Sequence, residues 1–289
     1  MKTILVPTDF SETANYALEV AVQLVEKYGA KLILLHMLEI PEHLLPTEQL
    51  SNDVASNQNT SQGDIPSAIF YMMLTKKRFK EMSELPFMQG IAYEEQIQNH
   101  QNFKGIVDSA HKFNADIIVM GSHGSSGLRE VFAGSNTEKV VRTSDIPVLV
   151  IKSRNENFDV KNFVFATNWE EENKEAFVNA SNLCQKFGAK MHLLYVNTSG
   201  SDFLTSNQIS DKFETLLKET KISPENISTN SYSDKSVEEG ILKFSKETNA
   251  DLIGVPTHGR RGLAHFFNHS IGEEVANHAE IPVITFKIN

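Results

Sequence analysis

Short apolar runs recur along the chain and alternate with longer stretches that are apolar on one face only. The short runs predict buried strands, and the longer stretches predict amphipathic helices. In the first half the predicted order is strand 3–6, helix 13–27, strand 32–37, helix 68–84, strand 91–97, helix 101–112, strand 116–120, helix 137–142 and strand 147–151. Between 42 and 64 the chain turns polar and rich in Ser, Asn and Gln, which predicts a surface excursion.

The second half repeats this order. Its predicted elements are strand 163–166, helix 174–187, strand 190–196, helix 208–220, strand 227–232, helix 237–248, strand 252–255, helix 272–278 and strand 283–287. Strands that alternate with helices predict an α/β fold, here two tandem doubly wound domains, each with a five-stranded parallel sheet flanked by helices. If each strand order is 3-2-1-4-5, ligands bind between the carboxyl ends of the first and fourth strands.

An internal repeat supports the division into two like-folded domains. The segment 27–35 (KYGAKLILL) recurs as 186–194 (KFGAKMHLL), 114–118 (NADII) recurs as 249–253 (NADLI), and 145–148 (DIPV) recurs as 280–283 (EIPV). The first copy carries about 24 extra residues between its second strand and its next matched segment. We predict domains at 1–152 and 153–289, joined by a short charged and polar linker at 152–161.

Composition narrows the class of protein. Of the 289 residues, 40% are hydrophobic and 22% charged, as in globular proteins, and the formal charge of −10 argues against nucleic acid or an anionic membrane as partner. The single Cys184 excludes an intrachain disulfide and a multi-cysteine zinc site, and is expected to be a buried, inert thiol. No long apolar run and no signal-like amino terminus are found, so a cytoplasmic location is expected.

Small and polar residues follow strand 116–120, where a ligand would bind. Between this strand and the next helix lie several glycines, among them Gly121, Gly124 and Gly134. Glycine lets a ligand approach the backbone closely, and the free N–H groups at a helix amino terminus attract an anion. The stretch therefore predicts a phosphate site, with a purely structural turn as the alternative. Further donors would come from Ser135, Asn136 and Thr137.

The first strand ends at Pro7, Thr8 and Asp9, across the expected crevice from the glycines. An acidic side chain at this place can accept hydrogen bonds from ribose hydroxyls. Met37 and Met120 end the second and fourth strands, and either pack against an adenine or belong to the core. Walker A and Rossmann fingerprints are both missing, because the chain has no Gly-Lys-Ser/Thr and no Gly-x-Gly-x-x-Gly after its first strand.

Three features together resemble the universal stress protein family. They are the segment 4–14 (ILVPTDFSETA), the strand end 34–37 (LLHM), and Gly121-x-x-Gly124 followed after nine residues by Gly134-Ser135. The last pattern marks the ATP-binding members of that family. The resemblance covers nearly the whole chain as a tandem pair, apart from 42–64, and implies an alternating α/β fold in each half with ATP held in the first.

The residues expected to bind the nucleotide follow from the matched positions. Asp9 would hold the ribose beside Pro7 and Thr8, and Met37 and Met120 would flank the adenine. The phosphate loop would be lined by Gly121, His123, Gly124, Arg129, Gly134, Ser135, Asn136 and Thr137. Magnesium would be carried by the phosphates themselves. No catalytic residue and no protein metal site are predicted.

The second copy departs from the pattern at the positions that matter most. Asp9 is matched by Asn168, Gly121 by Pro256 and Gly134 by His269, while Gly259 and Ser270 persist. Proline removes a backbone donor, and asparagine accepts hydrogen bonds less strongly than a carboxylate. We therefore expect ATP in the first half only. His258, His265, His269 and His278 could form a zinc or nickel site, but their spacing favours solvent-facing side chains.

The sequence favours an ATP-binding stress-response protein that acts as a nucleotide-dependent regulator or sensor. A slow ATP hydrolase or phosphate-transferring enzyme is the first alternative, with His123 and Arg129 as the groups near the phosphates. His123-Gly124 recurs as His258-Gly259 in the degenerate copy, which points to a structural task for the histidine, so binding is favoured over turnover. A non-catalytic scaffold that recruits protein partners through 42–64 is the second alternative.

The resemblance also implies pairing through the last strands, 148–151 and 283–287. In a tandem chain these two strands could pair with each other and form an intrachain pseudo-dimer, and whole chains could form a homodimer in addition. The sequence does not identify the physiological signal, the partner proteins or a ligand of the second domain.

Overall fold

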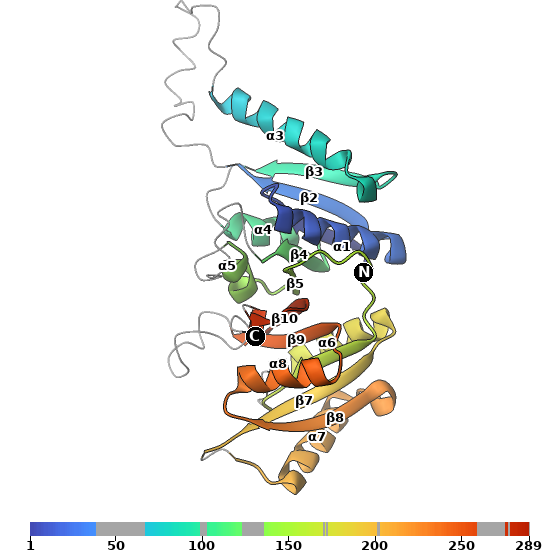
Figure 1. The fold of residues 1–289 in the computed structure, drawn as a ribbon, viewed down its shortest axis with the longest axis vertical. Coiled ribbons are helices and arrows are strands. Elements are labelled where there is room, and N and C mark those ends of the chain that lie inside the picture. Colours follow the sequence, from blue (N-terminus) through green and yellow to red (C-terminus); the bar gives the residue numbers. More distant parts are fainter. Residues whose placement is uncertain are drawn as a thin grey trace, which may run out of the picture.

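The computed structural model describes residues 1–38, 67–98, 103–122, 136–169, 171, 173–200, 203–258, 275, 276 and 278–288. Their strands form one ten-stranded sheet in the order β3-β2-β1-β4-β5-β10-β9-β6-β7-β8 (Figure 1). Each half therefore contributes five strands in the predicted order 3-2-1-4-5. The predicted α/β architecture is confirmed.

The element bounds lie within a few residues of the predicted ones. The first half contains β1 Thr3–Pro7, α1 Glu12–Tyr28, β2 Lys31–Met37, α3 Ser67–Ser83, the 3-10 turn η2 Pro86–Met88, β3 Tyr93–Gln98, α4 Lys104–Lys112, β4 Ile117–Gly121, α5 Asn136–Thr143 and β5 Val148–Ile151. The second half contains β6 Asn162–Ala166, α6 Asn173–Phe187, β7 Lys190–Thr198, α7 Ser206–Thr220, η3 Pro224–Asn226, β8 Ile227–Asp234, α8 Val237–Glu247, β9 Leu252–His258 and β10 Val283–Ile288. The excursion 42–64 and most of the predicted helix 272–278 lie outside the described residues.

The two halves join through their last strands. β10 pairs antiparallel with β5, and Val283 lies opposite Val150 in the register. The other strand pairs within each half are parallel. The expected pairing of last strands is thus found within one chain, and the strands of the two halves run in opposite directions where they meet.

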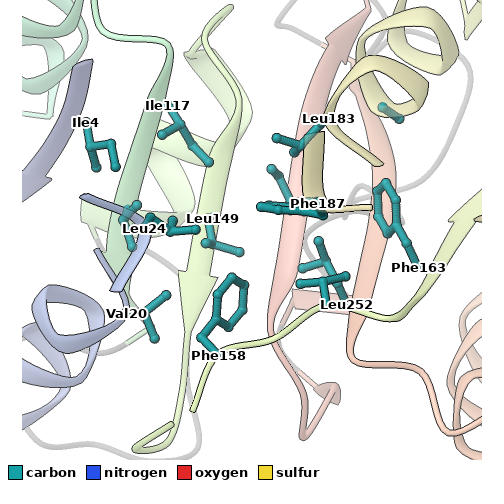
Figure 2. Close-up of a cluster of buried hydrophobic side chains, with 14 of the residues drawn as sticks. Ile4, Val20, Leu24, Ile117, Leu149, Phe158, Phe163, Leu183, Phe187 and Leu252 are labelled. Atoms are coloured by element: carbon teal, nitrogen blue, oxygen red, sulfur yellow. The ribbon is translucent and has the colours of Figure 1, made fainter. Parts of the chain in front are cut away.

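Helices cover both faces of the sheet, and each face has one apolar core that runs through both halves. The first core lies under α1, α3, α6 and α7. The second lies under α4, α5, α8 and the described residues between 275 and 279. Figure 2 shows the first core at the junction, where Leu149 and Phe158 approach Phe187 from the other half. Among the described helices, none has the length and apolarity that a membrane span requires.

The repeated Asn-Ala-Asp triplet has a structural explanation. Asn114 and Asn249 take left-handed backbone conformations with φ of 50° and 48°, which asparagine tolerates better than most residues. The carboxylate of Asp116 then accepts hydrogen bonds from the backbone N–H groups of Lys2 and Thr3, and Asp251 does the same with Lys161 and Asn162. Each triplet thereby fastens the start of the fourth strand to the start of the first.

The segment 152–161, predicted as a linker, is bound along α1. The guanidinium of Arg154 bonds the carboxylate of Glu19. The side-chain amide of Gln23 bonds the backbone of the segment at two places: its Nε2 donates to Asn155 O, and its Oε1 accepts from Phe158 N. Lys27 lies 3.3 Å from Asp159. Glu19, Gln23 and Lys27 are spaced one helical turn apart and so share one face of α1. We call residues 152–161 the strap.

Candidate functional site

The carboxyl ends of β1 and β4 lie side by side, as the predicted strand order requires. Leu5 of β1 pairs with Ile118 of β4, so the segments that follow the two strands are neighbours. This places Thr8 and Asp9 next to Gly121 and Ser122, at the edge where doubly wound sheets bind their ligands. The structure brings together the described members of the predicted site.

The turn after β1 is held by local hydrogen bonds. Thr8 is buried, its N–H donates to Leu35 O at 2.8 Å, and its hydroxyl accepts from the N–H of Phe10 at 3.0 Å. Asp9 is half-buried, and its Oδ1 accepts from the N–H of Ser11 at 3.0 Å. Ser11 in turn caps α1, since its hydroxyl accepts from Ala14 N. The Asp9 carboxylate is thereby fixed in direction.

Gly121 allows α1 to approach the end of β4. A Cβ built at Gly121 would lie 2.7 Å from the carbonyl carbon and oxygen of Thr13, and 2.9 Å from Ala14 N. These are backbone atoms, which cannot move aside as a flexible side chain can. A glycine is therefore required here for helix packing, whatever the ligand. The sequence pattern predicts a ligand contact for this glycine but carries no sign of its contact with α1.

Thr137 connects the start of α5 to the end of β4. Its side chain is buried, and its hydroxyl donates to Gly121 O at 2.8 Å. This bond positions the helix amino terminus over the end of the strand, while Asn136 at the first helical position is exposed. The hydroxyl proton of Thr137 is thus used within the protein, and its oxygen can only accept from a further group.

The two predicted adenine-flanking methionines differ in their surroundings. Met120 is 5% exposed and belongs to the core on the α4 and α5 face of the sheet. Met37, at the end of β2, is half-buried and packs against the same core. Both side chains therefore serve the core on this face, and Met37 is the more accessible of the two.

Three aromatic rings support the Asp9 turn, and none of them is among the site residues predicted from the sequence. Phe10 packs on His36 with ring centroids 4.7 Å apart and on Phe79 of α3 at 5.2 Å. His36 Nδ1 lies 2.8 Å from Thr8 O and must donate, because a carbonyl oxygen has no proton. Arg78 stacks over the outer side of Phe10, 5.6 Å from the ring centroid. Phe10 itself has a φ of 64°.

The second half preserves this support with other residues. Trp169, at φ 68°, takes the place of Phe10 and packs on Tyr195 at 5.0 Å and on Phe213 at 4.4 Å. Thr167 N donates to Leu194 O, as Thr8 N does to Leu35 O. The aligned copies thus carry an aromatic residue after each first strand, and this repetition is the sequence signal that could have identified Phe10.

The second half differs from the first at the position matched to Gly121, where α1 contacts the end of β4. Pro256 occupies the matched position, and β9 continues past it to His258 in register with β10. Helix α6 begins at Asn173, and Asn173 Nδ2 donates to Asn168 Oδ1. The Asn168 side chain is therefore engaged by a residue of the following helix, whereas Asp9 bonds the backbone before its helix.

The rest of the predicted phosphate loop lies outside the described residues: His123, Gly124, Arg129, Gly134 and Ser135. So do Gly259, His265, His269 and Ser270 of the second half. Within the part of the chain that the structure describes, no group of three or more His, Cys, Asp or Glu side chains is arranged to hold a metal ion. The alternative of a zinc or nickel site at His258, His265, His269 and His278 is untested, because His265 and His269 lie outside the described residues.

Known proteins share both the sequence pattern and the fold. The model of the universal stress protein family matches residues 1–152 and 160–287. Universal stress protein MJ0577 of Methanocaldococcus jannaschii is 34% identical over 168 residues, which are 53% of this chain and 96% of that protein. Universal stress protein MJ0531 of the same organism is 28% identical over 152 residues, 52% of this chain and 82% of that protein.

A solved structure matches the full length of the chain. A universal stress protein from Archaeoglobus fulgidus has a TM-score of 0.62 with this structure, covering 99% of this chain and 96% of that one. The two sequences are 18% identical, so this likeness concerns the fold alone. The tandem arrangement of two such units in one chain therefore has a solved counterpart in overall architecture.

Proposed function

The chain is a tandem member of the universal stress protein family, and from that premise we propose that its first half binds ATP as a regulatory ligand. The observation that carries the proposal is the meeting of three features at one edge of the sheet. They are the fixed carboxylate of Asp9, the end of β4 at Gly121 against the start of α1, and the amino terminus of α5. A carboxylate suits ribose hydroxyls, and a helix amino terminus suits phosphates.

In this proposal Asp9 binds the ribose beside Pro7 and Thr8, and Met37 and Met120 lie on the adenine side. The phosphates contact Gly121, Asn136 and Thr137 together with His123, Gly124, Arg129, Gly134 and Ser135. Magnesium, when present, accompanies the phosphates. The division into 1–152 and 153–289 is part of the same proposal, because only the first unit has the complete nucleotide motif.

Regulation, as opposed to mere binding, is supported by the position of α1. The amino-terminal turn of α1 contacts Gly121 at the site, and one face of the same helix binds the strap through Glu19 and Gln23. A packed helix moves as a rigid element, so a change at the site can alter the strap and the junction of the two halves. ATP would thereby shift the surface offered to partner proteins.

We further propose one nucleotide per chain. In the second half Pro256 has no N–H to donate, and the Asn168 side chain is engaged by Asn173. Titration calorimetry of ATP into the full chain tests both points. We expect one site per chain. Its affinity for ATP should fall at least about tenfold in Asp9→Ala and should not change in the matched variant Asn168→Ala. Two equal sites, or equal effects of both variants, would contradict the proposal.

Hydrolysis is tested on the same protein by a single-turnover measurement with saturating ATP. The regulatory role predicts that bound ATP is recovered unchanged. Rapid hydrolysis that is lost in Arg129→Ala or His123→Ala would instead establish the enzymatic alternative.

A further inference from the structure

The outer face of α3 carries a concentrated apolar surface. Ile69, Phe70, Met72 and Met73 are 49%, 55%, 44% and 57% exposed. Among the described residues they account for all but Phe203 of the large hydrophobic side chains that are exposed. We call these four residues the apolar patch. Scattered surface apolar residues need no explanation, but a contiguous group in the first turns of one helix indicates a binding surface.

A group of lysines continues the same face toward the end of the helix. Lys76, Lys77 and Lys80 are exposed, and helical spacing places Lys76 and Lys80 in line with Ile69 and Met73. Lys77 pairs with Glu81 at 3.7 Å, and both side chains are mostly in water. We call these three residues the lysine patch. The exposed face of α3 is therefore apolar in its first half and cationic in its second.

Helix α7 of the second half shows that the fold does not require this surface. The two helices match on their inner faces, where Phe79 and Phe213 pack edge-on against the ring after the first strand of each half. With these residues aligned, Ile69 and Phe70 correspond to Phe203 and Leu204 just before α7, and Phe203 is 56% exposed. The other positions of the two patches correspond to polar or acidic residues: Ser206, Asn207, Ser210, Asp211 and Glu214. The counterpart surface thus lacks the two exposed methionines and is acidic where α3 is cationic.

We propose that the two patches of α3 are the docking surface for an amphipathic acidic helix of a partner protein. Its apolar side chains would lie on the apolar patch, and its carboxylates would meet the lysine patch. Helix α3 lies at the end of the molecule beside the edge strand β3 (Figure 1), where a partner can reach it. Methionine side chains adapt to differently shaped apolar partners, which suits such a surface.

The charges on α3 favour an acidic helix over two other binding partners, a second copy of this chain and an anionic membrane. In a pair of α3 helices from two copies, a parallel arrangement sets lysine patch against lysine patch. An antiparallel arrangement turns each lysine patch toward the positive amino-terminal end of the other helix. An anionic membrane would favour lysines around the whole apolar patch, whereas here the lysines border it at one end only. An acidic helix satisfies both patches at once.

The test uses the full chain and a dye-labelled synthetic helix with leucines on one face of its first half and glutamates on that face of its second half. Fluorescence anisotropy should show binding of this peptide. A peptide with lysines in place of the glutamates should bind at least about tenfold more weakly. Two variants exchange the α3 residues for their α7 counterparts, Met72→Ser with Met73→Asn, and Lys76→Ser with Lys77→Asp and Lys80→Glu. Each should weaken binding of the acidic peptide by a similar factor.

The matched control is Asp211→Lys with Glu214→Lys on α7, which adds lysines beside Ser206 and Asn207 in place of the two methionines and should create no binding. Circular dichroism melting of each variant confirms that the fold is kept. Binding that is absent, or equal for both peptides, overturns the proposal. So does sedimentation equilibrium that shows a dimer abolished by the apolar variant, or flotation of the wild-type chain with anionic lipid vesicles.

Discussion

Arg154 and Glu19 form a two-pronged ion pair that fastens the strap to α1. Arg154 Nε lies 3.0 Å from Glu19 Oε2, and Arg154 Nη2 lies 3.1 Å from Glu19 Oε1. Glu19 is only 7% exposed, so its carboxylate depends on this partner. The same helix contacts Gly121 at its amino terminus. One helix therefore joins the candidate nucleotide site to the segment between the two halves.

Removal of Arg154 should destabilise the protein more than its exposed position suggests. Arg154→Ala leaves the buried carboxylate of Glu19 without its guanidinium, and we expect a measurable fall in the free energy of unfolding. Urea unfolding followed by circular dichroism measures the loss. The control is Glu156→Ala, because Glu156 also pairs with Arg154, at 2.9 Å, but its side chain is 71% exposed. Equal losses in the two variants would show that the Glu19 pair has no special role.

Gly121→Ala should disturb both stability and the nucleotide site. The added Cβ would meet backbone atoms of Thr13 and Ala14 at less than 3 Å, so the start of α1 has to shift. We expect a loss of about 1–3 kcal/mol in the free energy of unfolding, together with weaker ATP binding. Asn136→Ala, at an exposed position on the same edge, should change stability by less than about 0.5 kcal/mol. A fully stable Gly121→Ala protein would refute the close approach of α1.

Cys184 should resist thiol reagents as long as the protein is folded. Burial raises the pKa of its thiol from 9.0 to about 12, and its Sγ donates to Ala189 O at 3.3 Å. At pH 8 almost no thiolate is present to react. An aromatic disulfide reagent should therefore label Cys184 only after denaturation with guanidinium. Rapid labelling of the native protein at pH 8 would contradict the buried position.

Lys152 gives stability a predictable dependence on pH. Burial lowers the pKa of its ammonium group from 10.5 to about 8. Below about pH 8 the ammonium group is charged in both states, and its partial burial lowers the stability of the folded protein. Between about pH 8 and 10.5 the folded protein has lost this proton while the unfolded chain still binds it, so stability rises with pH. The cost of burial therefore disappears as pH rises.

Lys152→Met should accordingly raise the free energy of unfolding at pH 7 by on the order of 1 kcal/mol, and by less at pH 10. Urea unfolding at both pH values measures the difference. Lys161→Met, at a side chain that is 78% exposed, serves as the control and should have little effect at either pH. A loss of stability in Lys152→Met at pH 7 would reverse the expected sign.

Local patterns in the sequence were sufficient for the elements and for most of the topology. Apolar periodicity predicts the strands and helices, and the repeated Lys-Tyr/Phe-Gly-Ala-Lys segment contains the glycines that end α1 and α6 in left-handed conformations, Gly29 and Gly188. Alternation of strands and helices then restricts the sheet to a few parallel arrangements. Placement of Asp9 beside Gly121 follows directly from that order.

Contacts between distant segments could not be read from the sequence. The strap has the composition of a linker, because its partners Glu19, Gln23 and Lys27 belong to a helix near the other end of the first half. Likewise, nothing local shows that Gly121 borders Thr13 or that Thr137 bonds Gly121 O. The apolar face of α3 also looks like a core-facing stripe until the packing of Phe79 shows which side is inward.

The sequence by itself determined the family, the tandem α/β fold and the edge of the sheet at which a nucleotide would bind, because each depends on periodicity and on motifs of a few neighbouring residues. Only the tertiary structure decided that β5 and β10 pair within one chain and that α1 joins the site to the strap. It also decided that α3 turns apolar side chains outward. The reason is physical: such features arise from side chains that meet across long separations in the chain, where no local propensity acts.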